Sequence, residues 1–166
     1  MVPRAAAPRP WLRALLWFWL GALIGTLGFF GALTRVVFEV VPEPAIAGHL
    51  VRRLLNPLLM AGTLSGVGLA ALGALLGRGR LAIVVPLLIS IPCIVNQFGV
   101  SRAVSEIHLT DPGLAPGMAA RFATLHELSV WLFMAALLAA ILLAAIHARL
   151  EVGSARGIGP NGDGTR

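Results

Sequence analysis

Eight ionisable or amide side chains stand close to the ends of long apolar stretches, and these are the residues with which this chain could do chemistry. Such groups near membrane depth are candidate functional positions, because it is costly to take them out of water into lipid. They come from separate parts of the sequence: Arg35, Glu39, His49, Asn96, Gln97, Arg102, His126 and Glu127. The pattern favours either a polar cluster that holds helices together or a ligand site.

Several of these residues have a simpler explanation. Arg35 and Glu39 are four residues apart, a spacing at which opposite charges on a helix form an ordinary salt bridge. Residues 124–127 match the Thr-x-x-Glu capping box of a helix start. His126 precedes Ser129 by three residues, so both side chains share one helix face. A structural polar cluster is therefore the leading interpretation, and a ligand or metal site is the alternative.

Metal binding rests on the histidines, because the chain has a single cysteine, Cys93, which excludes an internal disulfide and a cysteine-based zinc cage. Imidazole suits copper, zinc or haem iron. Three of the four histidines fall on one side of the predicted bundle, at His49, His108 and His126. None of them forms an HxxxH or HExxH pair. The metal candidates are His126 and His49, and the sequence names no particular metal.

Dedicated enzymatic chemistry is not expected from this sequence. It contains no Gly-rich phosphate loop, no Walker sequence and no GxSxG elbow. It has no tyrosine and few carboxylates at membrane depth, so a catalytic constellation is hard to build. No cofactor can be named from the residues.

The elements that must position these side chains are four long apolar stretches. A spanning helix needs about 20 apolar residues to cross a hydrocarbon core of about 30 Å. Only 12% of the residues are charged and the mean hydropathy is +0.88, whereas soluble domains carry about 25% charged residues. Arg13 is the one charged residue within the stretches, at an edge where it can reach the interface. The stretches are 12–33, 57–76, 81–100 and 128–146. They predict an all-α protein, an integral membrane four-helix bundle.

The connections add one more element. Pro42 and Pro44 end the first helix. The segment 45–55 then carries apolar residues every four positions and predicts a short amphipathic helix at the interface, between helices one and two. Residues 77–80 predict a tight turn between the second and third spans, and the last helix is expected to start soon after Pro116.

Arginine counting orients the bundle. Four spans place both termini on one side, here called the terminal side, and the opposite side is called the outer side. The terminal side holds eight of the 13 arginines, so the positive-inside rule predicts cytoplasmic termini. The domain organisation expected is a cytoplasmic N-terminal segment, a four-helix transmembrane domain and a disordered cytoplasmic tail, at 1–11, 12–150 and 151–166.

Composition also limits the partners. The chain has no lysine and is rich in alanine, glycine and arginine, which is typical of a GC-rich bacterial genome, so a bacterial plasma membrane is the expected location. The net charge of +6 has no basic stripe with interleaved aromatic residues, which argues against nucleic acid as a partner. The lipid bilayer is the partner that the sequence predicts.

Glycine spacing predicts close helix contacts. Small residues three or four positions apart let helix backbones approach in lipid. The first stretch carries Gly21, Gly25, Gly28 and Ala32, and the second carries Gly62, Gly66, Gly73 and Gly77. The expected result is tight packing of spans one and two, although the same faces are compatible with a homo-oligomer.

Residues 121–130 resemble the Arg-Phe-x-x-Leu-His-x-Leu-Ser signature that opens the last helix of the transmembrane protein 205-like family, also called domain of unknown function 4149. Three further segments are similar to it: the glycine-rich first helix ending in Phe29-Phe30, residues 50–57 and residues 96–102. This chain has Asn56 where the family more often has phenylalanine, and Ser101 where it often has proline. The resemblance covers nearly the whole chain.

The resemblance implies a four-helix membrane protein without a settled activity, and relatives linked to platinum-drug resistance suggest metal or xenobiotic handling. It implies that Asn96 and Ser129 hydrogen-bond across helices and that His126 binds a ligand or shuttles a proton. It also implies that Arg102 and Arg121 meet anionic headgroups or substrate. We therefore expect an accessory or structural membrane protein with a polar cluster at the outer helix ends. The alternative is a protein that handles a metal, haem or small molecule through His126.

Overall fold

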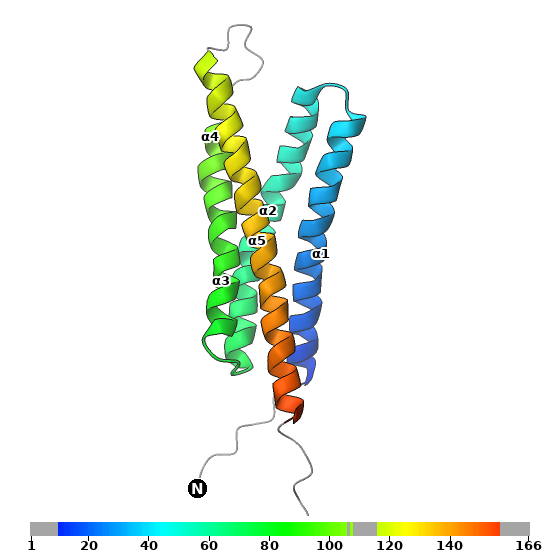
Figure 1. Ribbon diagram of the computed structural model, residues 1–166, viewed down its shortest axis with the longest axis vertical. Helices are drawn as coiled ribbons and strands as arrows, with labels where there is room; N and C mark the ends of the chain where they lie inside the picture. Colours follow the sequence, from blue (N-terminus) through cyan, green and yellow to red (C-terminus); the bar gives the residue numbers. More distant parts are fainter. Residues whose placement is uncertain (1–9, 106, 108–115, 157–166) are drawn as a thin grey trace, which may run out of the picture.

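The computed structural model describes residues 10–105, 107 and 116–156, and within them the chain is a bundle of long helices without a β-strand (Figure 1). In chain order the elements are α1 (Pro10–Val40), α2 (Pro44–Leu75), α3 (Leu81–Ile94), the π-helical segment η1 (Val95–Val100), α4 (Ser101–Ser105) and α5 (Pro116–Arg156). Because α3, η1 and α4 follow one another without a break, they form one continuous rod.

Four helical spans among the described residues are long and apolar enough to cross a bilayer. The shortest of them, Leu81–Val104, has 24 residues. At about 1.5 Å per residue it is roughly 36 Å long, which exceeds a hydrocarbon core of about 30 Å. The prediction of an all-α protein with four long apolar helices is confirmed among the described residues, and by length and composition these helices are consistent with a multi-pass membrane protein.

Helix ends fall where proline and glycine predict them. α1 ends at Val40, two residues before Pro42, and α5 begins at Pro116, where a proline needs no hydrogen-bond partner for its nitrogen. Between α2 and α3, Gly77 and Gly79 have φ values of +64° and +80°. Residues that carry a side chain rarely adopt positive φ values, so the tight turn depends on both glycines.

The predicted short amphipathic helix at 45–55 is not confirmed as a separate element, because these residues form the first turns of α2. Pro57 lies inside α2 without ending it, since its missing N–H removes only one backbone hydrogen bond. The segment also packs on the protein: Ala47 is fully buried, and the Arg52 guanidinium donates to the backbone carbonyl of Ser101 at 3.2 Å. These contacts hold it in line with α2.

Three glycines of α2 lie directly against α3: Gly62, Gly66 and Gly73. A Cβ added at Gly62 would lie 2.7 Å from the Cys93 sulfur, and one at Gly66 would lie 2.5 Å from the Pro86 carbonyl oxygen. Ser90 donates a hydrogen bond to the Thr63 carbonyl at 2.9 Å in the same contact. Small residues on α2 are therefore required for the approach of α3.

The glycine stripe of α1 does not pack on α2, so the predicted packing of spans one and two through their glycine faces is wrong. Nothing lies within 4 Å of a Cβ added at Gly21, Gly25 or Gly28. α1 buries its leucine face instead, at Leu16, Leu20, Leu23 and Leu27. Its contact with α2 includes the ring of Trp19, which packs over Gly68. The predicted homo-oligomer stays a prediction, now restricted to the α1 stripe.

Some predicted features lie outside the described residues. They include most of the N-terminal segment, His108 and the tail beyond residue 156. The structure does show that α5 continues to Arg156. Residues 151–156, which the sequence assigned to the tail, are therefore helical.

Candidate functional site

Among the predicted site residues, Asn96 and Ser129 are brought together across two helices. Asn96 lies in η1 and its side chain is fully buried. Its amide nitrogen donates to the Ser129 backbone carbonyl at 3.2 Å, and the Ser129 hydroxyl donates to the Asn96 amide oxygen at 2.9 Å. The hydrogen bonds expected across helices for this pair are present, and they join η1 to α5.

The charged members of the predicted cluster do not join that pair. Arg35 and Glu39 form an ion pair at 2.8 Å along α1, and their side chains are 83% and 60% exposed. His126 is exposed and stacks on Phe122, one turn earlier in α5. Glu127 accepts a hydrogen bond from the Trp131 indole at 3.4 Å. Each of these contacts lies within a single helix.

The remaining predicted residues are placed at the surface. His49 on α2, Arg102 on α4 and Arg121 on α5 are exposed, and Gln97 is half-buried. The part of the chain that the structure describes contains no group of three or more His, Cys, Asp or Glu side chains placed to hold a metal ion.

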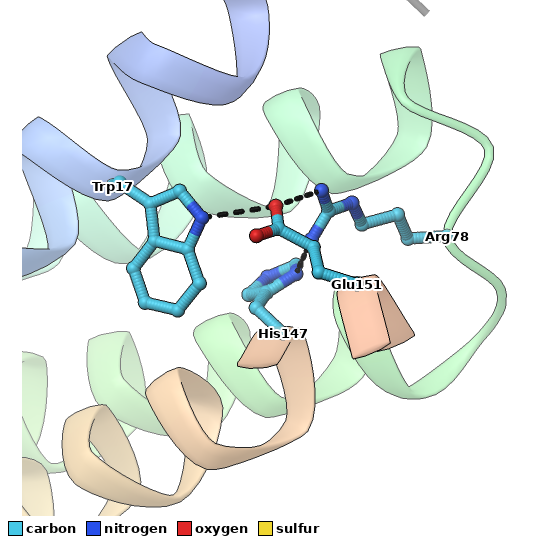
Figure 2. Close-up of polar contacts among 4 residues, drawn as sticks. All are labelled: Trp17, Arg78, His147 and Glu151. Carbon is cyan, nitrogen blue, oxygen red and sulfur yellow. Dashed lines mark hydrogen bonds and ion pairs between the residues drawn. The ribbon is translucent and has the colours of Figure 1, made fainter. Parts of the chain in front are cut away.

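A second polar centre lies at the terminal side, and the sequence did not predict it. It consists of Trp17 from α1, Arg78 from the α2–α3 turn, and His147 and Glu151 from α5 (Figure 2). We call these four residues the terminal cluster. The Arg78 guanidinium donates to the Glu151 carboxylate at 2.6 Å, and the Trp17 indole donates to the same carboxylate oxygen at 2.9 Å. The carboxylate therefore joins both of its partners to α5.

Arg78 also fixes the state of His147. One of its terminal nitrogens lies 3.0 Å from His147 Nδ1. A guanidinium has donors only, so Nδ1 must be the acceptor and the proton of a neutral ring must be on Nε2. His147 is fully buried, and its Nε2 has no hydrogen-bond partner among the described residues. The ring is thus held by one bond and carries one unused donor.

A pocket of about 500 Å³ opens beside the terminal cluster. Its lining combines two arginines, one carboxylate, two glycines and two leucines: Arg13, Leu76, Gly77, Arg78, Gly79, Leu150 and Glu151. The Arg78 side chain is only 9% exposed and the Glu151 side chain is 34% exposed. The pocket is therefore lined by an ion pair whose arginine is nearly buried and by the exposed Arg13.

Sequence reasoning missed the terminal cluster because its members fall in four separately treated parts of the chain: the first apolar stretch, the turn at 77–80, the end of the last stretch and the tail. One signal was present: His147 and Glu151 are four residues apart, so they share a face at the end of the last helix. A second signal was the position of Arg78 between Gly77 and Gly79, because a tight turn holds the arginine side chain close to the helix ends.

Comparison of the chain with protein-family models, with curated proteins and with solved structures gave no match. The resemblance to the transmembrane protein 205-like family therefore stays a prediction.

Proposed function

We propose that this multi-pass membrane protein has an accessory or structural role, in which buried polar contacts fasten its helices to one another. The observation that carries the proposal is the terminal cluster. Arg78, in the short turn between α2 and α3, binds the His147 and Glu151 side chains of α5. The Glu151 carboxylate also accepts a hydrogen bond from Trp17 of α1. Three separate parts of the chain meet in this one network.

The other polar contacts between helices support the same role. Trp19 of α1 donates to the Ser65 hydroxyl of α2 at 3.0 Å. Ser90 of α3 bonds α2, and the Asn96–Ser129 pair joins η1 to α5. Hydrogen bonds between membrane helices contribute about 0.6 kcal/mol each on average, so several are needed to define one arrangement. These contacts are distributed along the bundle rather than gathered around one ligand.

The alternative function is the handling of a metal, haem or small molecule through His126. Its support is that His126 is exposed on α5 and a single imidazole can contribute to a site shared with a partner. Under this alternative the family resemblance and its link to metal handling would apply to this chain.

One experiment distinguishes the structural role from the ligand-handling alternative. The protein is purified in detergent as wild type, as His126→Ala and, for a matched exposed histidine, as His49→Ala. Bound metals and the visible absorption spectrum are measured for each. The structural proposal predicts no stoichiometric metal and no haem band in any of them. A stoichiometric metal or a Soret band that is lost only in His126→Ala would overturn it in favour of the alternative.

A further inference from the structure

The pocket beside the terminal cluster carries more positive charge than its neighbours neutralise. Arg78 is paired with Glu151 at 2.6 Å, which balances one charge of each sign. Arg13 also lines the pocket and takes no part in the hydrogen bonds of the terminal cluster. The lining therefore has a net charge of one positive unit, and Arg13 is its exposed arginine.

Arg78 has donors to spare for such an anion. A guanidinium carries five N–H donors in a planar fork, and two bonds of Arg78 are made within the terminal cluster. Guanidinium groups bind phosphate oxygens through paired, charge-assisted hydrogen bonds. Arg78 is also held in place by those two bonds, so little side-chain freedom is lost when a ligand binds.

The turn leaves room for a headgroup to approach. Nothing lies within 4 Å of a Cβ added at Gly77 or Gly79, so the backbone beside the pocket is open. Leu76 and Leu150 supply an apolar wall next to the arginines. This combination of a basic patch and an apolar wall, at the end of membrane-spanning helices, matches the two parts of a phospholipid at the level of its phosphate.

We propose that this pocket binds a phosphate group, with Arg13 and Arg78 as its ligands. The source that fits its place at the end of the spans is the headgroup of an anionic phospholipid in the leaflet on the terminal side. A soluble phosphate compound has the same chemistry at the arginines but does not need the apolar wall.

Native mass spectrometry of the full chain in detergent tests the proposal. The probes are phosphatidylglycerol, phosphatidylcholine and inorganic phosphate, added separately to wild type, Arg13→Gln and Arg149→Gln. Arg13 and Arg149 are both exposed arginines at the same end of the bundle, but Arg149 is outside the pocket lining. Because Arg13 is exposed, its replacement is expected to leave the fold and the Tm in detergent unchanged.

Wild type should retain one phosphatidylglycerol per chain in preference to phosphatidylcholine. Arg13→Gln should weaken this binding roughly fivefold, the effect of about 1 kcal/mol for one arginine near a charged headgroup, whereas Arg149→Gln should not. Displacement of the lipid by millimolar inorganic phosphate, dependent on Arg13, would support the phosphate site and assign it to a soluble ligand. Equal weakening in both variants, or no retained lipid and no bound phosphate in wild type, would overturn the proposal.

Discussion

Arg78 shows how much a single residue in a short turn can hold together. Its guanidinium is nearly buried and contacts two α5 side chains, one charged and one neutral. Removing it would leave the Glu151 carboxylate partly desolvated without its cation and would leave His147 Nδ1 without a donor. Both effects act in the same direction, because a buried polar group without a partner is costly.

We predict that Arg78→Met lowers the stability of the bundle by about 1–2 kcal/mol, a value that allows for the partial exposure of Glu151. Glu151→Gln should cost less, because the amide oxygen still accepts from the Trp17 indole. The double variant should be less destabilised than the two single variants added together, since the pair is in direct contact. Unfolding of the wild type and the three variants, followed by tryptophan fluorescence, measures this, and strictly additive effects would show that the ion pair contributes nothing.

Asn96 and Gln97 are neighbours with opposite expected effects. The Asn96 amide makes two hydrogen bonds to Ser129, whereas the Gln97 amide oxygen is buried and has no hydrogen-bond partner in the described part of the chain. We expect Asn96→Leu to destabilise the protein by about 0.6–1.7 kcal/mol, and Gln97→Leu to be neutral or stabilising. The same unfolding measurement checks both, and a larger loss in Gln97→Leu would mean that its amide has a partner in the membrane.

At the scale of elements, apolar length and helix breaks were predictable but helix faces were not. Four spans, the end of α1 before Pro42 and the start of α5 at Pro116 follow from hydrophobic length and from proline chemistry. The face of α1 that turns inward could not be predicted in this way, because glycine and leucine are both compatible with lipid. The predicted outer cluster is incomplete for a related reason: residues at one depth need not face each other, and Arg35 faces away.

Glycines of α1 and α2 should differ in their tolerance of an added methyl group. Gly66 faces the Pro86 carbonyl and the Ser90 side chain, whereas Gly25 faces open space. We predict that Gly66→Ala destabilises the bundle by about 1–3 kcal/mol through overpacking, and that Gly25→Ala leaves it unchanged or slightly more stable. Thermal unfolding in detergent compares the pair. A large loss in Gly25→Ala, together with a change in the mass of the particle, would indicate that the α1 stripe contacts a second copy.

The whole molecule distributes charge unevenly along its long axis. The terminal cluster, Arg13 and the arginines of the α2–α3 turn lie at the end where α1 begins and α5 ends (Figure 1). That is the side on which the sequence places eight of the 13 arginines. Part of this charge is neutralised inside the fold, however, because Arg78 is paired with Glu151.

Orientation should therefore depend on the arginines that remain unpaired, and we predict that both termini face the cytoplasm. Reporter fusions after Arg156 and within the α1–α2 connection after Pro42 would measure it. A fluorescent protein should be active at the first site and periplasmic alkaline phosphatase at the second. Neutralising Arg13 and Arg80 together should raise the fraction of inverted molecules, while Arg78→Gln should reduce stability with little effect on orientation. The contrast follows because the ion pair with Glu151 neutralises the charge of Arg78, whereas Arg13 and Arg80 keep theirs; an equal effect of Arg78 on orientation would show that all three act as loop charges.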